Sequence, residues 1–139
     1  MNQIKTDSSE QIEYQKVFLH WIKTSDEDYK AMKNLFLSKS YNWSLFVGHI
    51  SIEKLLKAIF VKKREKHAPI THNLLKLADL CNLKISNEFS DWLDIITTFN
   101  INARYDDYKN AFYKTCSKEF SYLWIKRIRE IRKWLKTML

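Results

Sequence analysis

Glycine and proline are nearly absent from this chain, and this scarcity constrains its fold more than any other feature. The 139 residues include one glycine, Gly48, and one proline, Pro69. A multi-stranded sheet needs residues that tolerate positive φ at its tight hairpins, and glycine supplies most of them. The sequence therefore disfavours a β fold and predicts an all-α protein.

Apolar residues at helical spacing predict two long antiparallel helices in the first half of the chain. In both segments they recur every three or four residues, as they do on the buried face of a helix. The first helix carries this face on Phe18, Ile22, Tyr29, Met32 and Phe36, with Ser25 in the gap and with Trp21 and Leu35 beside it. The pattern breaks over residues 39–42, and a second helix is predicted over about residues 43–63.

Local signals divide the second half of the chain into shorter elements. A charged run ends the second helix before Pro69, because a proline disfavours helical geometry in the residue that precedes it. Thr71 and Ser86 are the predicted N-caps of two shorter helices. The polar, tyrosine-rich residues 105–116 show no sustained period and are predicted to form a loop, and a final helix is predicted to open near Ser117.

These elements predict one domain, an up-and-down helical bundle of about five helices, four of them main. Residues 1–10 lack a periodic apolar pattern and are expected to be a flexible leader, with the bundle over residues 11–139. A chain of this size can bury a core without disulfides or metal. The predicted core consists of Trp21, Phe36, Leu45, Ile52, Leu56, Leu74, Leu93, Ile96, Trp124 and Ile131.

The chain is basic, with a formal net charge of +8. Part of this charge lies on the last predicted helix, where Lys126, Arg129, Lys133 and Lys136 occupy the side opposite the apolar residues. Such a charge favours attraction to nucleic acid, nucleotides or an acidic partner. The alternative is a solvated surface that only keeps the protein soluble.

Cysteine content and hydropathy predict a cytoplasmic protein without membrane association. Cys81 and Cys116 are the only cysteines, too few for a disulfide framework and without the spacing of a zinc site, so both are expected to be reduced thiols. No stretch approaches the roughly 18 to 20 apolar residues that span a bilayer. The polar, acidic start of the sequence is also unlike a signal peptide.

Four segments, taken in order, resemble the HEPN family of small helical-bundle domains. They are Trp21–Met32 on the first helix, Tyr41–Ala58 with its string IEKLLKA on the second, Thr71–Leu77 at the opening of the third, and Ala103–Asp106 after the fourth. The string alone is ordinary helix-forming sequence, so the order and spacing of the four segments carry the resemblance. It implies a helical bundle, as the periodicity does.

The resemblance also implies a function. Many HEPN domains are ribonucleases in which an arginine that holds phosphate is followed, after four to six residues, by a histidine that moves protons. Arg104 matches the arginine, but Lys109, Asn110 and Ala111 stand where the histidine would be, and all four histidines precede Arg104. The resemblance therefore implies a non-catalytic HEPN domain that dimerises, binds nucleotide or RNA, and works with a small nucleotidyltransferase in a toxin–antitoxin arrangement. The alternatives are a ribonuclease toxin with a degenerate motif and a pure interaction scaffold.

One group of candidate binding residues lies on the second helix, where His49, Glu53 and Lys57 share one face at four-residue intervals. They are either a structural Glu–Lys pair with a hydrogen-bonded histidine or part of a ligand or dimer cleft. With no further ligand at suitable spacing, they do not predict a metal site. His72, next to the predicted cap Thr71, is expected to be a capping or packing residue.

The other candidates are Arg104, Tyr105 and Asp106. Arg104 either belongs to a structural cluster, held by a carboxylate of Asp28, Glu53 or Asp106, or binds the phosphate of a nucleotide or RNA. No resident cofactor is expected. Magnesium is expected only together with a bound nucleotide, on the adjacent carboxylates of Asp106 and Asp107.

Overall fold

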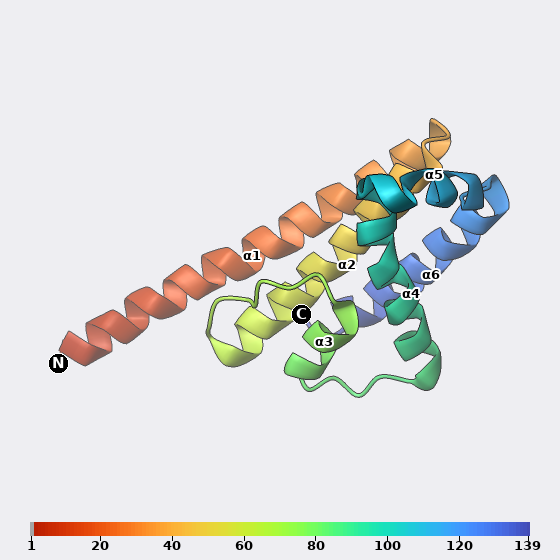
Figure 1. The fold of residues 1–139 in the computed structure, drawn as a ribbon. Coiled ribbons are helices and arrows are strands. Elements are labelled where there is room, and N and C mark those ends of the chain that lie inside the picture. Colours follow the sequence, from red (N-terminus) through yellow and green to blue (C-terminus); the bar gives the residue numbers. More distant parts are fainter. Residues whose placement is uncertain (1) are drawn as a thin grey trace.

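The computed structural model describes residues 2–139, except for the side chains of residues 2–8 and Ile12. This part of the chain folds into six helices and contains no strand, which confirms the predicted all-α bundle (Figure 1). The helices are α1 (Asn2–Leu37), α2 (Tyr41–Arg64), α3 (Leu74–Leu80), α4 (Asn87–Arg104), α5 (Asp106–Thr115) and α6 (Lys118–Lys136). Most side chains of residues 1–10, the expected leader, are not among those that the structure describes. The backbone of this segment from Asn2 onward belongs to α1.

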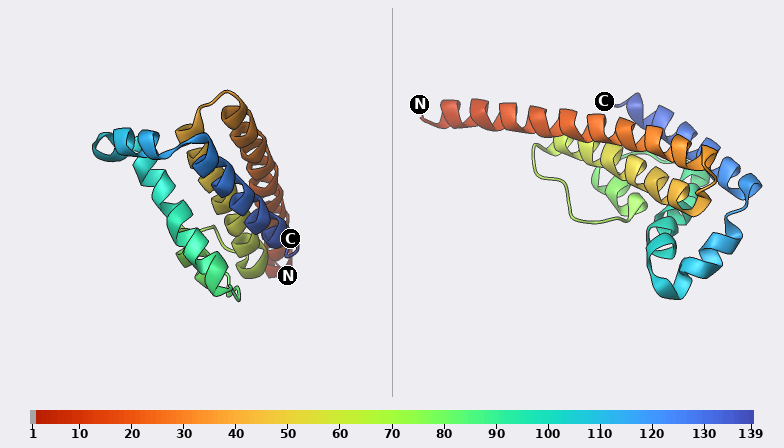
Figure 2. Two further views of the ribbon diagram at one scale, coloured as in Figure 1. Left: turned by 90° about the vertical axis from the view of Figure 1, so that its right-hand side faces the viewer. Right: turned by 90° about the horizontal axis from the view of Figure 1, so that it is seen from above.

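Helix α2 is the centre of the bundle, and α1, α3, α4 and α6 all pack against it (Figures 1 and 2). α1 and α2 run antiparallel, as predicted. Gly48 lies where three helices meet, because a Cβ atom there would come within 2.7 Å of Ile128 Cδ1 on α6 and 2.8 Å of Met32 Sδ on α1. The single glycine of the chain thus allows α1 and α6 to approach α2 closely.

The predicted caps of the later helices are partly confirmed. Ser86 is confirmed as the N-cap of α4, because its hydroxyl accepts a hydrogen bond from the N–H of Phe89 at 3.1 Å. Ser117, near which the last helix was predicted to open, caps α6 in the same way, with a bond of 3.1 Å from the N–H of Phe120. The prediction for α3 was wrong, because its N-cap is Asn73, whose side chain accepts from the N–H of Lys76 at 3.0 Å. Thr71 instead accepts from the N–H of Asn73, so the helix begins later than predicted.

The loop predicted over residues 105–116 was wrong, since most of it is helix α5. Phe112 is the one buried residue of this short helix, and its ring lies 5.5 Å from that of Phe99 on α4. One anchor produces no repeating apolar pattern, which is why periodicity missed the helix. Asp106 and Asp107 in its first turn stabilise it through their interaction with the helix dipole.

The core follows the prediction with two corrections. Eight of the ten predicted core residues are buried, whereas Trp21 and Phe36 are only half-buried. Trp21 lies near the middle of α1, and the ammonium group of Lys57 lies 5.5 Å from the centre of its ring. Phe36 lies near the α1–α2 turn, 5.3 Å from the ring of Tyr41.

Within the described residues, no helix is both long and apolar enough to cross a membrane.

Candidate functional site

A buried polar network lies on α2 and contains the predicted His49, Glu53 and Lys57. Glu53 Oε2 accepts a hydrogen bond from Lys57 Nζ at 3.1 Å, and Glu53 Oε1 accepts one from His72 Nδ1 at 2.7 Å. We call these four residues the Glu53 cluster. His72 is therefore neither a cap nor a simple packing residue, and sequence reasoning missed it because the loop after α2 brings it back over that helix.

His49 is the most enclosed member of the Glu53 cluster. Its Nε2 donates to the carbonyl of His72 at 2.9 Å, while its buried Nδ1 has no partner among the described residues. Burial lowers the pKa of His49, and the positive charge of Arg104 lowers it further, whereas the bond to His72 and the charge of Glu53 act in the opposite direction. His49 is therefore neutral at neutral pH, with its proton on Nε2.

Arg104 is the last residue of α4 and lies on the surface. Its Nε donates to the carbonyl of Asn100 at 3.0 Å, and its guanidinium lies 5.6 Å from the ring of Phe46 and 5.5 Å from that of Tyr105. A cation at this position also interacts favourably with the carboxyl end of the helix dipole. These contacts hold the guanidinium in place although Arg104 as a residue is exposed.

Two of the three carboxylates that could have made Arg104 a structural residue, those of Asp28 and Glu53, are engaged elsewhere, and Asp106 is exposed without an ion pair to Arg104 among the described side chains. Asp28 pairs with Lys54 at 2.7 Å, and Glu53 pairs with Lys57 and His72. Among the side chains that the structure describes, no carboxylate lies within ion-pair distance of Arg104. The guanidinium is thus a positive charge without a fixed counter-charge among those side chains.

Arg104 and the Glu53 cluster lie on the same side of the molecule. Phe46, which lies under the guanidinium, comes three residues before His49 on α2, so the two lie about one helical turn apart. We call the surface formed by Phe46, Arg104, Tyr105 and His72, with the buried remainder of the Glu53 cluster beneath it, the α2–α4 face. Lys109, at the first position where a catalytic histidine would fall, holds its ammonium group 5.5 Å from the ring of Trp43.

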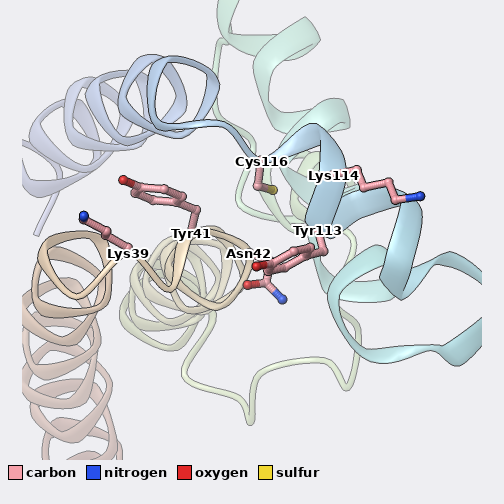
Figure 3. Close-up of a pocket in the computed structure, with 6 residues that line it drawn as sticks. All are labelled: Lys39, Tyr41, Asn42, Tyr113, Lys114 and Cys116. Atoms are coloured by element: carbon pink, nitrogen blue, oxygen red, sulfur yellow. The ribbon is translucent and has the colours of Figure 1, made fainter.

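Asp106 lies on a neighbouring cavity of about 360 Å³ that Asn42 and Tyr113 also line. These two residues take part in a second cavity, of about 380 Å³, between the α1–α2 turn and α5. Figure 3 shows Asn42 and Tyr113 pointing toward each other there, and Lys114 pointing away. Cys116 also lines it, but burial raises the pKa of this thiol to about 12, so the cavity offers no reactive thiolate.

The site offers little for a metal ion. Where side chains are described, no three His, Cys, Asp or Glu residues converge as metal ligands would. His49, Glu53 and His72 come near one another, but their polar atoms are directed at each other and at a backbone carbonyl. The guanidinium of Arg104, beside the ring of Tyr105, is a group that can recognise an anion.

Comparisons with known proteins bear on the fold and the family. The crystal structure of TT1696 from Thermus thermophilus superposes with a TM-score of 0.75 at 14% identity, covering 88% of this chain and 98% of that one, which supports the fold alone. A search of curated proteins found no match. The model of the HEPN domain matches residues 18–138, nearly the whole chain. The chain therefore belongs to the HEPN domain family.

Proposed function

We propose that this HEPN domain is a non-catalytic module that binds a nucleotide or RNA through its α2–α4 face. The observation that carries the proposal is the state of Arg104, an exposed guanidinium held by Asn100 and Phe46 but paired with no carboxylate among the described side chains. A planar fork of N–H donors matches the oxygens of a phosphate group. Binding a phosphate would supply the counter-charge that these side chains do not.

The neighbours of Arg104 have supporting roles in this proposal. Tyr105 is 53% exposed as a residue, and its ring, beside the guanidinium, can stack on a base. His49, Glu53 and Lys57 form the layer beneath and hold His72 at the surface. Asp106, exposed at the start of α5, can take part in holding magnesium when a nucleotide brings the ion with it.

Direct binding measurements test the proposal against the interaction-scaffold alternative. The purified protein is titrated with ATP, with and without magnesium, and with a trinucleotide of RNA, by calorimetry and by thermal shift. A ligand that binds only the folded state raises its melting temperature. We expect binding of at least one of these ligands, and saturating concentrations of all of them without heat or thermal shift would favour the scaffold.

We also propose that the domain works as a homodimer. Apolar and aromatic side chains lie partly or fully exposed around the α2–α4 face, among them Trp43, Phe46, Ile50 and Tyr105. Contiguous apolar surface of this kind commonly marks an interface. Light scattering at about 50 µM, well above typical dissociation constants of stable dimers, should give twice the monomer mass. A monomer mass at that concentration would contradict the proposal.

Family membership extends the proposal to a setting. We expect a cytoplasmic protein that partners a small nucleotidyltransferase in a toxin–antitoxin arrangement. Co-purification from the native source tests the partner. Overexpression in a bacterial host tests the role, because a non-catalytic binder should not arrest growth.

One observation favours a second candidate, a ribonuclease that replaces the missing histidine with one from elsewhere. Glu53 accepts from Nδ1 of His72, whose side chain is 58% exposed, and a carboxylate–histidine pair of this kind can orient the other ring nitrogen for proton transfer. Cleavage of single-stranded RNA by homogeneous protein, lost in His72→Gln and in Arg104→Ala, would establish this candidate. The proposed function expects no cleavage by the parent protein.

A further inference from the structure

A second, strongly basic site lies in a groove between α1 and α6. The groove has a volume of about 580 Å³. Lys30 and Lys33 line it from α1, and Arg129 and Lys133 line it from α6. These four residues are called the basic groove. The sequence predicted that Arg129 and Lys133 lie on the exposed side of the last helix. It did not show that Lys30 and Lys33 of α1 line the same groove.

The charge of the basic groove is not cancelled by the side chains around it. Among the described residues, Asp26 is the only acidic one that lines it, and its carboxylate is held by Arg132 and Lys136, each at 2.7 Å. The four cations of the basic groove form no ion pair with any side chain that the structure describes. Like charges this close repel one another, and an anionic ligand would remove that repulsion.

The chemistry of the lining selects the kind of anion. Of the residues found to line the groove, Tyr29 is the only aromatic one, and Lys33 Nζ and Arg132 Cζ lie 4.8 and 4.6 Å from the centre of its ring. A protein partner would need an apolar anchor pocket, and an anionic membrane would need apolar side chains to insert. Apart from Tyr29, the described lining contains no residue with an apolar side chain. Adjacent phosphates of one strand need only a line of cations.

We propose that the basic groove binds the phosphodiester backbone of a single nucleic-acid strand without sequence preference. The site is distinct from the α2–α4 face. The groove lies on the side of α2 where Gly48 meets Met32 and Ile128, the neighbours in sequence of Lys33 and Arg129. Lys57 follows Gly48 by nine residues, which is two and a half turns of helix. Lys57, a member of the Glu53 cluster, therefore lies on the side of α2 opposite to Gly48. The inference therefore does not depend on the proposed function.

The test measures binding of a fluorescein-labelled RNA of about 20 nucleotides by anisotropy, over about 50 to 200 mM KCl. The groove variant is Arg129→Glu with Lys133→Glu. The matched control is Lys66→Glu with Lys84→Glu, which changes the net charge equally at two exposed residues outside the groove. We expect the groove variant to lose at least tenfold in affinity and the control less than twofold. The slope of log affinity against log salt should become shallower by about 1.4 in the groove variant, since each lost contact to single-stranded RNA contributes about 0.7.

Two further arms separate the basic groove from the α2–α4 face, and RNA from other polyanions. The same groove effect is expected in an Arg104→Ala background, so the groove and the proposed function can fail independently. Equal losses in the groove and control variants, or no loss in either, would overturn the inference. Groove-dependent binding of poly-glutamate or of phosphatidylserine vesicles as tight as that of RNA would overturn the assignment of a nucleic-acid strand as the ligand.

Discussion

Arg132 on the last helix donates a hydrogen bond of 2.6 Å from Nη1 to the hydroxyl of Ser25 on the first. Ser25 in turn donates to the carbonyl of Ser51 at 2.6 Å, so one chain of hydrogen bonds joins α6, α1 and α2. The Arg132 residue is only 4% exposed, and its second nitrogen donates to Asp26. Burial lowers the pKa of Arg132 and the charge of Asp26 opposes this, so the pair keeps a buried charge tolerable.

Replacing Arg132 should destabilise the fold strongly. Arg132→Ala removes a buried charge-assisted network and leaves a cavity, and we expect the free energy of unfolding to fall by about 3 kcal/mol. Urea denaturation of the parent and the variant measures this. The control is Arg129→Ala, one turn earlier and exposed, which should change stability by less than about 0.5 kcal/mol. Similar effects of the two substitutions would contradict the role assigned to Arg132.

Stability should depend on pH through His49. Its pKa is lowered in the folded state, so below the ordinary value of 6.5 the unfolded chain binds a proton that the folded protein resists. The contribution is fully present above pH 6.5 and is lost as the pH falls toward the lowered pKa, by at most about 1.4 kcal/mol per pH unit.

The measurement is urea denaturation between about pH 7.5 and 5, which stays above the ordinary pKa values of Asp and Glu, about 3.9 and 4.3. His49→Gln should flatten the dependence, whereas His67→Gln, which replaces an exposed histidine, should leave it unchanged. A parent protein equally stable at both ends of that range would contradict the buried neutral state of His49.

Both thiols should be unreactive in the folded protein. Burial raises the pKa of Cys81 to about 11 and that of Cys116 to about 12, and only the thiolate attacks a disulfide reagent. With Ellman's reagent at about pH 8 we expect negligible labelling of the native protein within minutes and labelling of both thiols in urea. Rapid labelling of a thiol without denaturant would show that its surroundings are more open than the structure has them.

Local chemistry explains what could be predicted from the sequence. The apolar stripes of α1, α2 and α6 repeat over several turns, and Ser86 and Ser117 satisfy the first N–H groups of their own helices. Both signals are complete within one segment of chain, so the helices and the all-α class followed from them. Helix α5 was not predicted because Phe112 is its one buried residue, and a single buried residue produces no periodic apolar pattern.

The missing parts of the sites depend on contacts between segments far apart. His72 reaches Glu53 across 19 residues, and Arg132 reaches Ser25 across 107. The basic groove also depends on such contacts, because Lys30 and Arg129 line one groove only when α1 and α6 lie side by side. Spacing placed His49, Glu53 and Lys57 on one face, but which carboxylates were already paired, and so which role Arg104 could have, required the tertiary structure.

Replacing Arg104 tests the proposed function most directly. ATP affinity by calorimetry and melting temperature are compared for the parent, for Arg104→Ala and for Arg64→Ala. Arg64 is the matched control, an exposed arginine that also donates one hydrogen bond to a backbone carbonyl, at the far end of α2. We predict that Arg104→Ala lowers the affinity on the order of tenfold, about 1.4 kcal/mol, while its melting temperature stays within about 3 °C of the parent and Arg64→Ala binds normally. Failure of the parent to bind ATP, or a large fall in melting temperature with unchanged affinity in Arg104→Ala, would contradict the assignment of Arg104 to ligand binding.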